Sequence, residues 1–220
     1  MPVTAFPQST GTLLLQGGAG LIDAVIEWPT GSIQRDAVAV ICHPHPLHGG
    51  TMTNKVVTTT AHALRDLGCT TLRFNFRGVG RSQGEHDDGR GEGDDVVSIC
   101  GWIRQARPGV TLILAGFSFG AFVSMTRAAE IHPQQLISIA PPVGRWNLSE
   151  FREPDCRWLV LQPDADEVVD PSGVYDWVAQ RRPPPTVVRF AETSHFFHGR
   201  LLALREAIAQ FVEAGLPPLA

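Results

Sequence analysis

The sequence predicts an α/β protein with a mostly parallel sheet, helices on both faces and a β hairpin at the N-terminus. Two apolar segments, 13–15 and 21–28, flank a glycine-rich stretch at 17–20, which is typical of a hairpin. The segment 37–42 (AVAVIC) is an unbroken apolar run, as expected for a strand buried on both faces. After it, strand-like and helix-like segments alternate, which favours a parallel sheet covered on both sides.

The first helix is expected at 54–67. Its apolar positions Val57, Ala61 and Leu64 follow the helical period, Asn54 suits its N-terminal cap, and a glycine at 68 suits its end. A strand follows at 70–74. We interpret the glycine-rich segment 76–84 as a structural loop that lines one wall of the cleft, because the acidic residues after it would repel a phosphate.

The rest of the chain repeats this alternation. We expect Asp94 to cap a helix over 94–106. Further strands are predicted at 111–115, 136–140, 158–162 and 186–190, and further helices at 119–131, 172–180 and 199–212. In the last helix the apolar face comprises Leu201, Leu204, Ile208 and Phe211. Ligands of such sheets bind beyond the carboxyl ends of the strands, so the residues that follow each strand are the site candidates.

Composition narrows the class of protein. A chain of 220 residues with 43% hydrophobic and 18% charged residues is expected to fold as one domain, 1–220. The net charge is −4 and no basic stripe is present, which argues against nucleic acid as a partner. No apolar run reaches the roughly 18 residues of a membrane helix, and the N-terminus lacks a cationic leader region. We therefore expect no membrane partner and a cytoplasmic location.

We interpret the four cysteines as reduced thiols: Cys42, Cys69, Cys100 and Cys156.

The strand at 111–115 runs into Gly116-Phe117-Ser118-Phe119-Gly120 and then into a helix. A G-x-S-x-G pattern between a strand and a helix is typical of a nucleophile elbow, where the tight turn requires glycines two residues either side of the serine. The helix N-terminus favours negative charge that develops at this position. Ser118 is therefore the candidate nucleophile, the alternative being a serine that only caps the helix.

A serine nucleophile needs a base, and the base needs an orienting acid. The strand at 158–162 leads to Asp166 and the strand at 186–190 leads to His195, so the order along the chain is Ser, Asp, His. His198 is the alternative base, and Asp164 and Glu167 are alternative acids.

An oxyanion hole needs two backbone N–H donors. Phe119, directly after the serine, is expected to supply one. The other is expected from the loop after the strand at 37–42, where proline residues lack an N–H. His45 is the first candidate there and Leu47 the alternative.

Three histidines in the same loop also raise the hypothesis of a metal site. His43, His45 and His48 would need a further ligand such as Asp87 or Asp88, and no further ligand motif is apparent. We interpret the loop as a rigid holder of backbone donors, and we predict no metal and no cofactor.

These motifs resemble those of the α/β-hydrolase superfamily, in particular its small capless bacterial serine hydrolases with H-P-H-P-L-x-G-G-T-M and F-N-F-R-G-V-G-x-S. The resemblance runs from about residue 37 to 201. It implies an α/β-hydrolase fold with a mostly parallel central sheet and no cap domain, with Ser118 as nucleophile, Asp166 as acid and His195 as base. Pro44 stands where the superfamily usually has the glycine of its oxyanion loop.

The protein is expected to be a serine hydrolase that cleaves small-molecule esters or thioesters through an acyl-enzyme. Only residues 141–157 separate two strands where larger relatives insert a lid, so we expect an open cleft that suits short acyl groups. Its apolar walls are expected from Phe117, Trp146 and Phe196, together with Phe119 and Phe197. The alternatives are a peptidase with the same triad, a noncatalytic ligand-binding protein of the hydrolase fold and a metal-dependent hydrolase.

Overall fold

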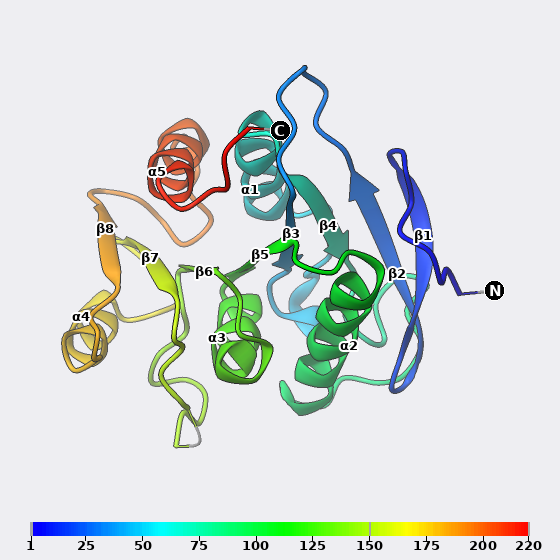
Figure 1. The fold of residues 1–220 in the computed structure, drawn as a ribbon. Helices are drawn as coiled ribbons and strands as arrows, with labels where there is room; N and C mark the ends of the chain where they lie inside the picture. Colours follow the sequence, from blue (N-terminus) through cyan, green and yellow to red (C-terminus); the bar gives the residue numbers. More distant parts are fainter. Residues whose placement is uncertain (1, 150, 220) are drawn as a thin grey trace.

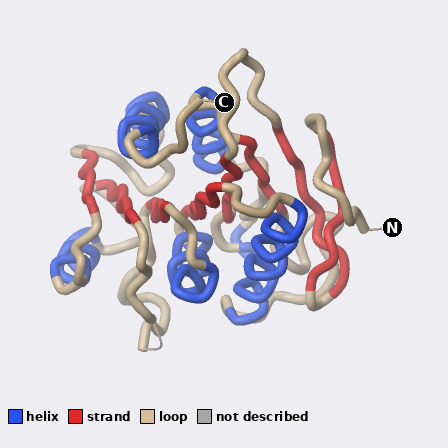
Figure 2. Tube along the Cα trace, viewed as in Figure 1, coloured by secondary structure: helices blue, strands red, loops and turns tan. Residues whose placement is uncertain are grey.

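The fold is an eight-stranded sheet covered by five helices (Figures 1 and 2). It comes from a computed structural model that describes residues 2–149 and 151–219. The strands are β1 (Gly11–Gly17), β2 (Gly20–Glu27), β3 (Ala37–Cys42), β4 (Thr70–Phe74), β5 (Thr111–Phe117), β6 (Gln135–Ile139), β7 (Arg157–Pro163) and β8 (Thr186–Phe190). The helices are α1 (Lys55–Asp66), α2 (Arg90–Ala106), α3 (Phe119–Ile131), α4 (Pro171–Ala179) and α5 (Leu201–Glu213), with a short 3₁₀ turn at Pro46–His48.

The strands lie in the order β1-β2-β4-β3-β5-β6-β7-β8. The N-terminal hairpin pairs β1 with β2 and joins the sheet by antiparallel pairing of β2 with β4. From β4 to β8 every pairing is parallel. The carboxyl ends of β3, β5, β7 and β8 therefore meet at one edge of the sheet, as the sequence predicted for an α/β-hydrolase fold.

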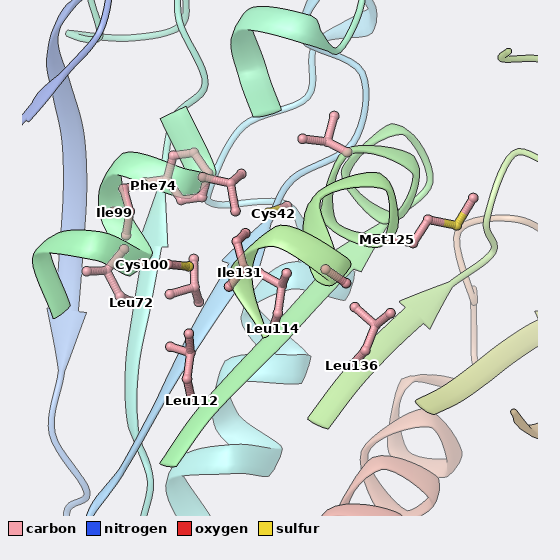
Figure 3. Close-up of a cluster of buried hydrophobic side chains, with 14 of the residues drawn as sticks. Cys42, Leu72, Phe74, Ile99, Cys100, Leu112, Leu114, Met125, Ile131 and Leu136 are labelled. Carbon is pink, nitrogen blue, oxygen red and sulfur yellow. The ribbon is translucent and has the colours of Figure 1, made fainter. Parts of the chain in front are cut away.

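Helices α1 and α5 cover one face of the sheet, and α2, α3 and α4 cover the other (Figure 1). Each face has its own apolar core. Figure 3 shows part of the core beneath α2 and α3, which includes Ile99 of α2, Met125 of α3 and Leu114 of β5. The strands of the sheet centre are buried on both faces, and this explains why they read as continuous apolar runs.

Helix α1 begins and ends one residue inside the predicted range of 54–67, and its predicted cap is confirmed. The Asn54 side chain accepts a hydrogen bond from the Val56 amide at 2.9 Å, which makes it the N-terminal cap. The predicted face of Val57, Ala61 and Leu64 is buried.

Helix α2 starts earlier than predicted, and Asp94 is not its cap. The helix begins at Arg90 after Gly89, whose amide donates to the buried Glu92 carboxylate at 2.9 Å. Asp94 lies on the exposed side of the helix and pairs with Arg127 at 2.8 Å. Glu92 thus accepts the amide of the residue before the helix, and Asp87, three residues before the helix, accepts the free Gly91 amide of the first turn at 3.1 Å.

Helix α5 also differs in detail. It begins at Leu201, two residues later than predicted, and its buried positions are Leu204, Ile208 and Val212, with Phe211 only partly buried. Among residues 2–149 and 151–219, no helix has the length and apolarity needed to cross a bilayer.

Candidate active site

Ser118 lies in the tight turn between β5 and α3 with φ 53° and ψ −119°. A Cβ on Gly116 would lie 2.1 Å from the Gly120 carbonyl oxygen, and a Cβ on Gly120 would lie 2.4 Å from the Cys42 carbonyl oxygen. Both distances are far below van der Waals contact, so only glycine fits at either position. The turn has the geometry that the sequence predicted for a nucleophile elbow.

His195 lies beside Ser118, with its Nε2 3.0 Å from the Ser118 Oγ. It belongs to the loop after β8 and its side chain is only 2% exposed. Its ring packs against those of Phe117 and Phe196, with ring centroids 5.0 and 5.1 Å away. The two aromatic rings therefore restrict the orientation of the imidazole.

Asp166 follows β7 and places its Oδ2 2.7 Å from His195 Nδ1. Its Oδ1 accepts hydrogen bonds from the amides of Val168 and Val169, each at 2.8 Å. Burial alone would raise the pKa of this carboxyl, but the hydrogen bonds from His195 and the two amides outweigh burial and lower its pKa. An ionised Asp166 accepts the Nδ1–H of His195, which leaves Nε2 free to accept the Ser118 hydroxyl proton.

The alternative acids have other partners. Glu167 Oε2 accepts the backbone amide of His195 at 3.1 Å, so it holds the histidine loop rather than the ring. Asp164 accepts hydrogen bonds from Tyr175 and from Arg189.

The alternative base, His198, lies elsewhere. Its Nδ1 is 3.5 Å from the Ser194 hydroxyl. The structure thus brings together Ser118, His195 and Asp166 and leaves the alternatives outside this hydrogen-bonded chain.

The side chains of the two predicted oxyanion residues, His45 and Phe119, lie next to each other. Phe119 is the first residue of α3, and the His45 ring lies 4.9 Å from the Phe119 ring. In the described part of the chain, neither backbone amide donates to a protein acceptor. Leu47, the alternative donor, instead uses its amide on His45 Nδ1 at 3.2 Å.

His43 has a structural role that the sequence reasoning missed. Its Nε2 accepts a hydrogen bond from the Phe76 amide at 3.0 Å, and its Nδ1 lies 2.6 Å from the Pro44 carbonyl oxygen. Burial lowers the pKa of His43 to about 4. A neutral ring with both nitrogens engaged ties the loop after β3 to the end of β4. The residues 2–149 and 151–219 contain no group of three or more metal-ligating side chains arranged to hold an ion.

The predicted apolar walls separate into exposed and buried residues. Phe196 is 42% exposed, and the half-buried Trp146 packs against Phe119 with ring centroids 5.1 Å apart. Phe117 is a correction: it is 1% exposed and supports His195 from below, so it cannot line an open cleft. Phe197 is a second correction: it is fully buried in the core, so it cannot line the cleft either.

Ion pairs hold the segment 76–84 in place, which agrees with its interpretation as a structural loop. Arg77 forms a pair with the buried Asp95 at 2.9 Å, and Arg81 forms one with Asp23 at 2.7 Å. The arginines of this motif therefore fasten the loop after β4 to α2 and β2.

A serine in a strand–turn–helix elbow, a histidine and an aspartate after later strands, and a mostly parallel sheet without an inserted domain together define the class of α/β serine hydrolases without a lid. The family described as serine aminopeptidase, S33, matches residues 37–154, just over half of the sequence. The chain belongs to this family of hydrolases.

Solved structures and a curated relative agree with this assignment. An α/β serine hydrolase without lid from Xanthomonas campestris is 49% identical, with a TM-score of 0.94 over 97% of this chain and 98% of the other. An α/β serine hydrolase homologue from Coxiella burnetii is 44% identical, with a TM-score of 0.89 over 94% of this chain and 99% of the other. An uncharacterized protein of Rickettsia prowazekii is 39% identical over 148 residues, which span 64% of this chain and 61% of that protein.

Proposed function

We propose that this chain cleaves small esters or thioesters through an acyl-enzyme on Ser118, with His195 as the base and Asp166 as the orienting acid. The observation that carries the proposal is the continuous hydrogen-bonded chain, 2.7 Å from Asp166 to His195 and 3.0 Å from His195 to Ser118. Hydrogen-bond reach between nucleophile, base and orienting acid is the geometric requirement for this chemistry.

Acylation begins when the Ser118 Oγ attacks the carbonyl carbon while His195 Nε2 takes the hydroxyl proton. The carbonyl oxygen becomes negatively charged, and the free amides of His45 and Phe119 are the donors proposed to stabilise it. Loss of one such donor typically lowers kcat by about 10²–10³. The first turn of α3 adds favourable electrostatics at the same position.

The imidazolium of His195 then returns its proton to the leaving oxygen or sulfur as the bond to the acyl carbon breaks. Asp166 remains ionised throughout, in keeping with its lowered pKa, and stabilises the charged ring. A water molecule activated by His195 hydrolyses the acyl-enzyme by the same steps in reverse.

Short acyl groups fit the site best, since no inserted domain covers it. The loop between β6 and β7 contributes Trp146 on one side, and Phe196 contributes the other. We expect turnover of 4-nitrophenyl esters to be highest for short acyl chains. A steady rise in kcat/KM up to long chains would contradict the short-chain preference.

Peptide hydrolysis is the second candidate, because the matching family is described as a serine aminopeptidase. An aminopeptidase must bind the ammonium group of its substrate, which calls for a free carboxylate near the serine. Two carboxylates beside His195, those of Asp166 and Glu167, already accept hydrogen bonds from it and are not free for this role. This favours esters, and hydrolysis of a panel of unblocked peptides at rates above those of esters would reverse the preference.

The test is intact-mass labelling with a fluorophosphonate probe. Wild-type protein should gain one adduct, and Ser118→Ala and His195→Ala should gain none. Asp164→Asn is the matched control, because Asp164 is bonded to Tyr175 and Arg189, outside the chain of hydrogen bonds. Labelling is expected to survive a chelator. A folded wild type without an adduct would refute the proposal, and loss of activity with chelator alone would favour a metal-dependent hydrolase.

A further inference from the structure

A hollow of about 250 Å³ lies next to the loop that carries His195, between the start of α1 and the segment 196–201. We call it the α1–α5 hollow. Val56, Phe196 and Leu201 form its apolar lining, and Lys55 and His198 are its basic lining residues. Helices α1 and α5 lie side by side on the same face of the sheet (Figure 1). The hollow lies where both helices begin, after the carboxyl ends of β3 and β8, which is the edge of the candidate site.

The hollow adjoins the side of the site from which a leaving group departs. His195 must deliver its proton to the leaving oxygen or sulfur, so the leaving group lies on the histidine side of the reacting carbon. The Phe196 ring packs against the His195 ring with centroids 5.1 Å apart, and the same residue lines the hollow. A leaving group that extends beyond Phe196 therefore enters this space.

The charge of the hollow is positive. Lys55 is the only lysine of the sequence and stands, exposed, as the first residue of α1. Within residues 2–149 and 151–219 its ammonium forms no ion pair, and none of the lining residues is acidic. The lining thus combines apolar surface with an unneutralised cation.

We propose that the α1–α5 hollow binds the leaving alcohol or thiol of the substrate, and that this leaving group carries an anion, a carboxylate or a phosphate, which pairs with Lys55. The inference rests on the proposed function. The bond between the acyl carbon and the leaving atom breaks, the electron pair goes to that atom, and its proton comes from His195. Phe196 and Leu201 pack against the apolar part of the leaving group, while Lys55 holds its charged end.

The test compares two acetate esters of equal size. One has 3-hydroxybenzoate as the leaving group, and the other has the neutral 3-hydroxybenzamide. The measured quantity is the ratio of kcat/KM for the anionic ester to that for the neutral ester, because this ratio cancels effects on acylation common to both. Wild type, Lys55→Met and Lys55→Arg are compared at low and high salt.

We expect Lys55→Met to lower the ratio about fivefold, the upper range for an exposed ion pair, and Lys55→Arg to retain it. High salt should lower the wild-type ratio towards that of Lys55→Met. Arg152→Met is the matched control: Arg152 lies next to Phe151, which packs in the core on the opposite face of the sheet, so the same loss of charge should leave the ratio unchanged. A third ester with a phosphate in place of the carboxylate shows which anion is preferred.

Two failures are distinguishable. If both esters are hydrolysed and Lys55→Met has the wild-type ratio, the leaving-group inference is wrong while the proposed function stands. If neither ester is hydrolysed and Ser118 takes no fluorophosphonate adduct, both are overturned.

Discussion

Replacing Ser118 by glycine is expected to give a more stable protein than replacing it by alanine. The backbone of Ser118 has φ 53° and ψ −119°, a region that residues with a Cβ rarely adopt. Such a conformation costs about 1–3 kcal/mol for a non-glycine residue. Glycine removes this strain but loses about 0.5–1 kcal/mol through the greater freedom of its unfolded chain. The net gain over alanine is therefore about 1 kcal/mol.

The comparison with Ser118→Ala isolates the strain, because both variants lose the hydroxyl and its contact with His195. In a chain of this size, about 1 kcal/mol corresponds to a rise in Tm of about 2–4 °C. Thermal unfolding followed by circular dichroism measures the difference. Ser98, in the interior of α2, is the control site: there the glycine variant should melt below the alanine variant. If Ser118→Gly melts at or below Ser118→Ala, the elbow stores no strain of this kind.

Three further predictions concern the surroundings of the site. His43 has a folded pKa of about 4 against an ordinary 6.5, so its neutral form stabilises the fold fully above pH 6.5, and this contribution, about 3 kcal/mol, is lost as the pH falls towards 4. The free energy of unfolding, measured with urea, should therefore depend less on pH between 6.5 and 4 in His43→Gln than in wild type. Equal pH dependence of the two proteins would contradict the buried neutral ring. Asp166→Asn should lower kcat for 4-nitrophenyl acetate by about 10³–10⁴, since an amide no longer fixes the productive imidazole tautomer, and near-normal turnover would remove Asp166 from the mechanism. Gly120→Ala should lose more than about 3 kcal/mol of unfolding free energy, since its Cβ would meet the Cys42 carbonyl oxygen at 2.4 Å, and a wild-type urea midpoint would show that the elbow can relax.

The strands were the most predictable part of the chain. Strands β3, β4 and β8 have the predicted limits. β3 is a continuous apolar run in the sheet centre, where both faces demand apolar side chains, and β4 and β8 are short segments rich in threonine, valine and other strand-forming residues. The order of Ser118, Asp166 and His195 also followed from the sequence, since each lies in the segment after a parallel strand and those strand ends share one edge.

The start of α2 could not be predicted from an aspartate alone. Asp94 resembles a cap locally, but its partner Arg127 belongs to α3 and becomes apparent only when the two helices pack together. The signal that was present is Glu92, three residues after Gly89, the spacing at which a first-turn carboxylate reaches back to the cap amide.

The burial of Phe117 and the role of His43 depend on strand order, which the sequence does not reveal. Phe117 is the last residue of β5, at the centre of the sheet, so the loop that carries His195 closes over it. His43 reaches the Phe76 amide because β4 lies next to β3, although α1 separates these strands along the chain.

The end of β3 joins the two halves of the proposed oxyanion hole. The Cys42 and His43 carbonyl oxygens lie against Gly120, so the elbow that carries the Phe119 amide packs directly on the strand that carries the His45 loop. His43 then ties that loop to the end of β4 through the Phe76 amide. Since both amides rest on one contact between backbones, a shift of either element changes the distance between the donors. This explains why the position needs a glycine: it sets the spacing of the oxyanion donors as well as the turn at Ser118.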